Sequence, residues 1–184
     1  MAAVRSVNDM KEALSSDCEV IFLMEGDILS LIHCVEETKK QNKHIFIHLD
    51  LMKGLAKDKE GVKYLAHMVK LDGIVTTKKS LIPIIKKMGL ISVLQLFMID
   101  TQALESGIAS IKSIQPDAVE MMPALMPRVI KDVTSRVDVP LILGGLIKTP
   151  AEAEEAIASG GVGLSVGCKK LWLNNLGWSN EHSL

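Results

Sequence analysis

The chain has 184 residues, of which 48% are hydrophobic and 23% are charged, and its formal net charge is −1. That length suits one domain with a sizeable core, and the charge balance gives no general attraction to nucleic acid. No apolar run approaches the roughly 20 residues of a membrane span and no signal peptide is recognisable, so we expect a cytoplasmic protein without membrane contact.

Short β-rich runs recur along the chain and are separated by helical patterns. In chain order they are Ala3–Arg5, Val20–Glu25, His44–Asp50, Gly73–Thr77, Ile91–Phe97, Ala118–Met122, Leu141–Leu143 and Gly161–Ser165. Their spacing of about 17 to 29 residues fits one strand and one crossover helix, which predicts a parallel sheet. We therefore expect an α/β fold, a single compact TIM-type (β/α) barrel with minimal loops over residues 1–172. Seven strands, without the weak first one, are the alternative, and residues 173–184 are expected to form a C-terminal tail.

Four side chains that can accept a hydrogen bond from a free backbone N–H stand where helical patterns begin. They are Asp27, Ser80, Asp100 and Thr149. Thr149 also opens a capping box that Glu152 completes. For Asp27 and Asp100, capping is preferred to a role in chemistry.

Polar residues occur at the C-terminal ends of the predicted strands, where barrels carry their functional groups. Glu25, Asp50 and Glu120 are candidate site residues, because carboxylates on barrel strands are rarely buried without a partner. His48 is a further candidate, with a hydrogen-bonded internal histidine as the alternative. Lys78 is either a site residue or a solvated loop lysine.

The last two predicted strands end in loops rich in glycine. Backbone N–H groups in such loops can bind a phosphate without a large basic patch, and barrels commonly bind phosphate after strands seven and eight. Lys78 would serve as a counter-charge. The residues expected to bind phosphate in the two loops are Gly144, Gly145, Ser165, Val166 and Gly167.

The sequence shows no pattern for metal, redox, nucleophilic or cofactor chemistry. The three cysteines, Cys18, Cys34 and Cys168, have no metal or redox spacing and are expected to be reduced, buried thiols. Neither a nucleophile–base pair nor a cofactor fingerprint is present, so we expect no cofactor, no metal and no catalytic residues. The six aromatic residues form no stripe on which single-stranded RNA could stack.

Several longer strings occur in a characteristic order. They are His48-Leu-Asp50-Leu-Met-Lys-Gly54-Leu55, Asp72-Gly73-Ile-Val-Thr76-Thr77-Lys78, Leu96-Phe97-Met-Ile-Asp100, Glu120-Met-Met-Pro123, Pro140-Leu-Ile-Leu-Gly144-Gly145-Leu146-Ile147 and Leu171-Trp172. Together they resemble the glycerol uptake operon antiterminator regulatory proteins over nearly all of residues 2–172. The resemblance implies a TIM-type barrel that responds to glycerol 3-phosphate. It also implies action on leader mRNA, where premature termination is prevented and genes for glycerol uptake and use are switched on.

The resemblance suggests how glycerol 3-phosphate would bind. Its phosphate would lie at the glycine-rich loops, and its hydroxyls would reach the polar strand ends. The residues expected to bind those hydroxyls are Glu25, His48, Asp50 and Glu120.

The chain departs from the family pattern at this same site. Gln95 replaces an arginine, Ala124 replaces a glycine, and Val166-Gly167-Cys168 replaces a Thr/Ser-Asn run. Glutamine cannot make the bidentate contact of arginine, so a weaker or altered ligand preference is expected.

Two functional alternatives stay open beside the regulator. One is a small barrel enzyme, an isomerase or lyase for a phosphorylated three-carbon substrate, with Asp50, Glu120 and Lys78 as its chemical groups. The other is a barrel that has lost its ligand response. For RNA binding, a homodimer that joins two lysine patches would help, because each phosphate contact adds to a salt-sensitive total. The candidate patches are Lys39/Lys40/Lys43, Lys53/Lys57/Lys59/Lys63, Lys86/Lys87 and Lys169/Lys170.

Overall fold

The computed structural model describes residues 1–173 and contains an eight-stranded parallel sheet rolled into a barrel. Around the ring, in chain order, lie β1 (Ala2–Val4), β2 (Val20–Leu23), β4 (His44–His48), β6 (Gly73–Thr76), β7 (Ile91–Phe97), β8 (Ala118–Met122), β9 (Leu141–Gly144) and β10 (Gly163–Ser165). Each predicted strand is present, including the first. The TIM-type barrel is therefore confirmed, and the seven-stranded alternative is wrong.

The N-terminus closes the barrel against the end of β10. The Ala3 N–H donates to the Val166 carbonyl at 3.0 Å, and the Val166 N–H donates to the Met1 carbonyl at 3.2 Å. The terminal ammonium of Met1 donates to the Leu164 carbonyl at 2.8 Å. These bonds supply the partners that the edges of β1 and β10 would otherwise lack.

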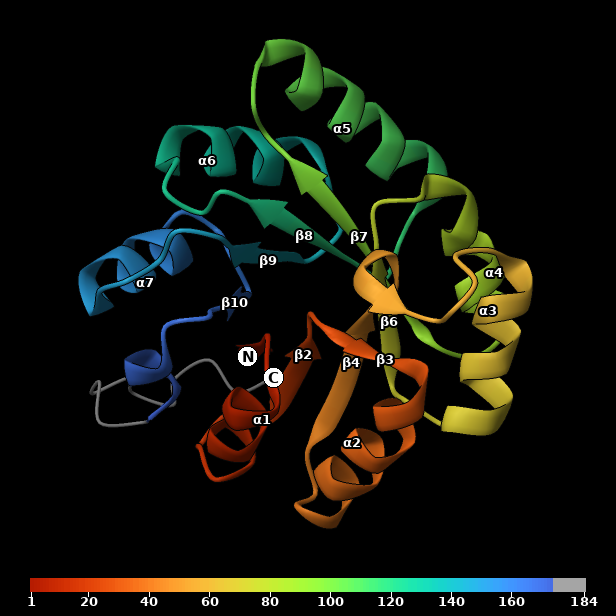
Figure 1. The fold of residues 1–184 in the computed structure, drawn as a ribbon. Helices are drawn as coiled ribbons and strands as arrows, with labels where there is room; N and C mark the ends of the chain where they lie inside the picture. Colours follow the sequence, from red (N-terminus) through yellow and green to blue (C-terminus); the bar gives the residue numbers. More distant parts are fainter. Residues whose placement is uncertain (174–184) are drawn as a thin grey trace.

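Helices surround the ring of strands, as Figure 1 shows. They are α1 (Val7–Leu14), α2 (Ile28–Lys40), α3 (Lys59–Tyr64), α4 (Ile82–Lys87), α5 (Thr101–Ile114), α6 (Pro127–Arg136) and α7 (Pro150–Ala158). Shorter turns are the 3₁₀ helices η1 (Leu49–Leu51), η3 (Lys79–Leu81) and η4 (Lys169–Trp172), and the π-helix η2 (Leu65–Val69). A second, two-stranded sheet pairs β3 (Gly26–Asp27) with β5 (Met52–Lys53), and the sequence patterns did not predict it.

Three of the four predicted caps are confirmed. The Asp27 carboxylate accepts from the backbone of Leu29 and Ser30, Asp100 accepts from the Ala103 N–H at 2.7 Å, and Thr149 completes its capping box. The prediction for Ser80 is wrong. The chain there first makes the η3 turn, so α4 begins after Leu81 and has no side-chain cap.

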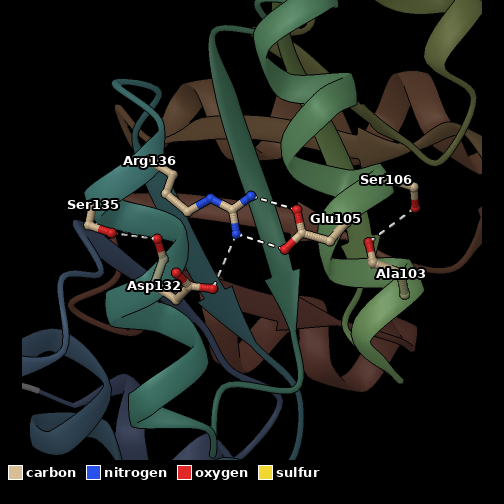
Figure 2. Close-up of polar contacts among 6 residues, drawn as sticks. All are labelled: Ala103, Glu105, Ser106, Asp132, Ser135 and Arg136. Atoms are coloured by element: carbon tan, nitrogen blue, oxygen red, sulfur yellow. Dashed lines mark hydrogen bonds and ion pairs between the residues drawn. The ribbon is translucent and has the colours of Figure 1, made fainter.

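Helices α5 and α6 are linked across the barrel surface by an ion pair (Figure 2). The Arg136 guanidinium donates to both carboxylate oxygens of Glu105, at 2.6 and 2.8 Å, and also contacts Asp132 at 3.4 Å. Hydrogen bonding to Arg136 lowers the pKa of the Glu105 carboxyl. Because water screens exposed ion pairs, this link contributes little to stability, but it occupies one of the few arginines of the chain.

The inside of the barrel is apolar in its N-terminal half. Alternate strand residues point inward, which is the two-residue period of a β-strand. The interior cluster consists of Ala3, Phe22, Met24, Phe46, Val75, Val93, Ala118 and Ile142. Two larger clusters fill the space between the strands and the surrounding helices.

Three further predictions concern the cysteines, contact with a membrane and the C-terminal tail. Cys18, Cys34 and Cys168 are free thiols but are half-buried rather than fully buried. Within residues 1–173, no helix is long and apolar enough to cross a membrane. The predicted tail lies, beyond Leu173, outside the residues that the structure describes.

Candidate functional site

The C-terminal half of the barrel interior is polar. His48, Gln95 and Glu120 each follow an interior apolar residue by two positions on the same strand, so they face the same way. Ser165 is paired in register with Gly144, two positions beyond the interior Ile142. All four polar side chains are buried, and Glu120 has no exposed surface.

Three of these side chains form one hydrogen-bonded chain. His48 Nε2 lies 2.8 Å from Gln95 Oε1, and Gln95 Nε2 donates to Glu120 Oε2 at 2.7 Å. With the amide in this orientation, its oxygen can only accept, so His48 carries its proton on Nε2. In the neutral imidazole, His48 Nδ1 is then the acceptor. Gln95 therefore sets the tautomer of the neutral His48 ring and orients the Glu120 carboxyl.

Three buried polar atoms at this end of the barrel have no hydrogen-bond partner among residues 1–173. They are His48 Nδ1, Glu120 Oε1 and Ser165 Oγ. Buried polar groups are nearly always hydrogen-bonded in folded proteins, so three such atoms together single out this end of the barrel as the candidate site. An acceptor, a carboxyl oxygen and a hydroxyl suit a ligand that carries hydroxyl groups.

Burial raises the pKa of the Glu120 carboxyl above its usual range, and Gln95, Ser165 and His48 oppose that shift. Ser165 Oγ lies near the carboxyl without completing a hydrogen bond to it. The folded chain therefore holds the Glu120 proton more tightly than the unfolded chain does.

This shift predicts how the stability of a Glu120→Gln variant depends on pH. The stabilising contribution of the Glu120 proton is present below the unfolded pKa, about 4.3, and is lost as pH rises through the higher folded pKa. Glutamine does not titrate, so the free energy of unfolding of the variant minus that of the wild type should increase over this interval and then level off. Urea denaturation of both proteins at a series of pH values would measure it. A difference that stays constant with pH would contradict the burial of a titrating carboxyl.

A glycine turn at the end of β9 lies beside this polar chain. A Cβ atom on Gly144 would stand 3.3 Å from Glu120 Oε1 and 3.3 Å from the Ser165 carbonyl. Gly145 follows with φ of +79°, a conformation that side chains rarely adopt. Within residues 1–173, the N–H groups of Gly145 and Gly167 donate to no other residue.

Val166 does not fit its predicted role as a backbone donor to phosphate. Its N–H donates to the Met1 carbonyl, and its carbonyl accepts from Ala3 and from the Trp172 indole. Barrel closure uses both backbone groups, so the prediction is corrected for this residue. Gly167, the next residue, keeps its N–H available.

Asp50 does not reach the polar chain either. Its carboxylate accepts from the Thr77 N–H at 2.7 Å, from Thr76 Oγ1 at 3.0 Å and from Thr77 Oγ1 at 3.1 Å. Asp50 lies on the η1 turn, beyond the end of β4, and ties that turn to the end of β6. These bonds satisfy the Asp50 carboxylate without the ligand hydroxyl that was predicted to bind there.

Lys78 and Glu25 have other partners as well. Lys78 Nζ donates to the Lys57 carbonyl at 2.7 Å, and Glu25 forms a 3.3 Å ion pair with Lys53 on the exposed side of β3 and β5. The structure thus brings together His48, Glu120, Ser165 and the glycine turn, and it shows neither Glu25, Asp50 nor Lys78 in contact with them.

Gln95 was not predicted as a site residue. It was noted only as a departure from a family pattern, yet it joins His48 to Glu120. The sequence does carry a signal for this role: Gln95 stands two residues after Val93 on the same strand, so its side chain faces the barrel interior. The other departure, Ala124, is buried, and its N–H donates to the Gly145 carbonyl at 3.4 Å.

Comparison with known proteins decides the family. The model of the glycerol-3-phosphate responsive antiterminator family matches residues 1–172. The chain belongs to this family. It is therefore a regulator of the antiterminator class, and the isomerase or lyase alternative is not supported.

Individual members of known structure agree with this antiterminator assignment. A glycerol uptake operon antiterminator regulatory protein from Listeria monocytogenes is 30% identical with a TM-score of 0.90, over 94% of this chain and 93% of that one. A related protein from Thermotoga maritima is 30% identical with a TM-score of 0.82, over 93% and 95% of the two chains. An uncharacterised protein of Escherichia coli K12, YgcP, is 30% identical over 172 residues, 94% of this chain and 90% of that protein.

Proposed function

We propose that this antiterminator-family regulator binds glycerol 3-phosphate at the C-terminal end of its barrel and acts on leader mRNA in the cytoplasm. The observation that carries the ligand part is the group of three unpartnered buried atoms beside the glycine turn. A small polyol phosphate can bond to the unpartnered buried atoms through its hydroxyls and to the backbone N–H groups of the glycine loops through its phosphate. Its hydroxyls would bond to His48 Nδ1, Glu120 Oε1 and Ser165 Oγ.

The phosphate would bind at the glycine-rich loops. Gly145 and Gly167 supply backbone N–H groups that have no acceptor within residues 1–173, and the Cβ position of Gly144 lies 3.3 Å from Glu120 Oε1. Backbone donors of this kind hold phosphate without a large basic patch. Lys78 is not needed as a counter-charge, since its ammonium group is bonded to the Lys57 carbonyl.

Ligand binding would regulate the protein through a difference in contacts between two states. A ligand shifts a conformational equilibrium only by its difference in affinity for the two forms. The loop from Gly145 to Thr149 is the segment that we expect to respond, because it joins the phosphate donor to the N-terminus of α7. Leu146 in this loop is exposed and has φ of +68°.

In the lysine patches that we consider for RNA binding, most ammonium groups already contact an acidic side chain or a backbone carbonyl. Within residues 1–173, acidic partners hold Lys39, Lys40, Lys53, Lys63, Lys86 and Lys169. Lys43 and Lys57 donate to backbone carbonyls instead. One protomer therefore offers few unpaired cations in each candidate patch. We propose that a homodimer joins two such faces into one RNA-binding surface.

The RNA part is tested by binding of a leader transcript from a glycerol-uptake gene of the same genome. We expect the affinity to change when glycerol 3-phosphate is added and to fall steeply with salt. If about six phosphates are contacted on single-stranded RNA, the logarithm of the association constant should fall with a slope of roughly −4 against the logarithm of the salt concentration. A scrambled RNA of equal length is the control. Undetectable binding at low salt with the ligand present would contradict the proposed action on RNA.

A further inference from the structure

Glu120 is unusual among the carboxyl groups of this protein because it is completely buried and has no cation beside it. One of its oxygens accepts from Gln95 and the other has no partner. Within residues 1–173, neither a lysine nor an arginine forms an ion pair with it. Buried carboxylates are ordinarily paired with a cation, so a molecule that binds here meets an uncompensated acid.

In the part of the chain that the structure describes, the groups near the unpartnered oxygen include no lysine or arginine that could compensate an incoming anion. Ser165 Oγ is a neutral hydroxyl, and in the neutral His48 ring the Nε2 proton is directed to Gln95, which leaves Nδ1 as an acceptor. Oε1 is itself buried, and a Cβ atom on Gly144 would stand 3.3 Å from it, so glycine at this position avoids a crowded contact with the oxygen. The available partners are two acceptor-capable atoms and one hydroxyl, which favour a donor over an anion.

We propose that Glu120 selects the chemical class of the ligand, admitting three-carbon phosphate esters that end in a hydroxyl and rejecting those that end in a carboxylate. This inference rests on the proposed binding of a phosphate ester at this site. A hydroxyl donates to Glu120 Oε1 and completes the hydrogen bonding of the acid. A carboxylate at the same place has no proton to donate, and above the pKa of Glu120 it also brings a second negative charge against the first.

The size of the discrimination follows from the like-charge repulsion. Two unit charges about 4 Å apart in an effective dielectric of about 20 repel each other enough to lower affinity by roughly 1,000-fold. Relaxation of the ligand and uptake of a proton from solvent will reduce this. We therefore expect glycerate 3-phosphate to bind at least about 100-fold more weakly than glycerol 3-phosphate.

Isothermal titration calorimetry of the full chain with these two esters tests the inference. In Glu120→Gln the charge is removed and the shape is kept, so the difference between the two affinities should narrow to about 10-fold or less. Glu154→Gln changes the net charge equally on the exposed face of α7 and should leave both affinities unchanged. The melting temperatures of both variants report whether they are folded.

The outcomes separate the inference from the proposed function. Comparable binding of the two esters to the wild-type chain would overturn the selection by Glu120 while leaving glycerol 3-phosphate as the ligand. An unchanged ratio in a folded Glu120→Gln variant would also overturn it. Failure of the wild-type chain to bind either ester would overturn the proposed ligand, and the inference with it. If the Glu120→Gln variant does not fold, the ratio of the affinities of the wild-type chain for the two esters tests the inference by itself.

Discussion

Gly145→Asp is expected to abolish the rise in melting temperature that glycerol 3-phosphate gives to the wild-type chain. Gly145 has φ of +79°, and its N–H is one of the two proposed phosphate donors. An aspartate there adds a negative charge on the residue that donates to the phosphate, and charge repulsion opposes binding. At a ligand concentration 100 times the dissociation constant, the wild-type chain should gain about 2.7 kcal/mol, or roughly 5–11 °C. The variant should gain nothing, as measured by differential scanning calorimetry.

Gly89→Asp is the matched control for this experiment. Gly89 has φ of +76°, and no atom lies within 4 Å of its Cβ position, so the backbone strain and the added charge are comparable. Gly89 follows α4 at the opposite end of the strands from the glycine turn. This variant should melt at a lower temperature and yet keep the full response to the ligand. A Gly145→Asp protein that retains the wild-type response would exclude the glycine turn as the phosphate site.

Gln95→Leu is expected to produce the largest loss of stability at the site. Leucine removes the donor to Glu120 Oε2 and the acceptor for His48 Nε2, and both atoms are buried. Each buried polar group left without a partner costs about 1–3 kcal/mol, so the free energy of unfolding should fall by roughly 2–5 kcal/mol. Equilibrium denaturation in urea gives this value directly.

The control for the second prediction is Gln102→Leu, the same exchange on the exposed face of α5. It should change the free energy of unfolding by no more than about 0.5 kcal/mol. A Gln95→Leu protein as stable as this control would show that the hydrogen-bonded chain from His48 to Glu120 contributes nothing to the fold.

The barrel itself was predictable from local patterns. Strands β7 and β8 begin and end at the predicted residues, because short apolar runs bounded by turn signals are typical of buried strands. The helix starts at Asp27, Asp100 and Thr149 also follow from nearby residues. The small β3–β5 sheet was not predictable, since its two-residue strands carry no periodic pattern and exist only where two loops meet.

The sequence anticipated part of the polar cluster in the barrel. His48 and Glu120 stand as polar residues on otherwise apolar strands, and the structure places them on one hydrogen-bonded chain, while their role in ligand binding stays a prediction. Asp50 and Lys78 were grouped with them because all lie at strand ends. The η1 turn instead directs Asp50 to Thr76 and Thr77, and nothing in the local sequence indicates that direction.

By itself, then, the sequence determined the barrel class, most helix starts and the family, while it left seven or eight strands open. Only the tertiary structure decided which polar groups meet. His48 and Gln95 are 47 residues apart, Gln95 and Glu120 are 25 apart, and their contact depends on the register of neighbouring strands around the ring. In the same register, the Val166 N–H donates to the Met1 carbonyl and closes the barrel. Glu120 Oε1 lies beside Gly144 without a hydrogen-bond partner. Hydrogen-bonding capacity is a property of each residue, but whether it is satisfied depends on the packing of the whole barrel.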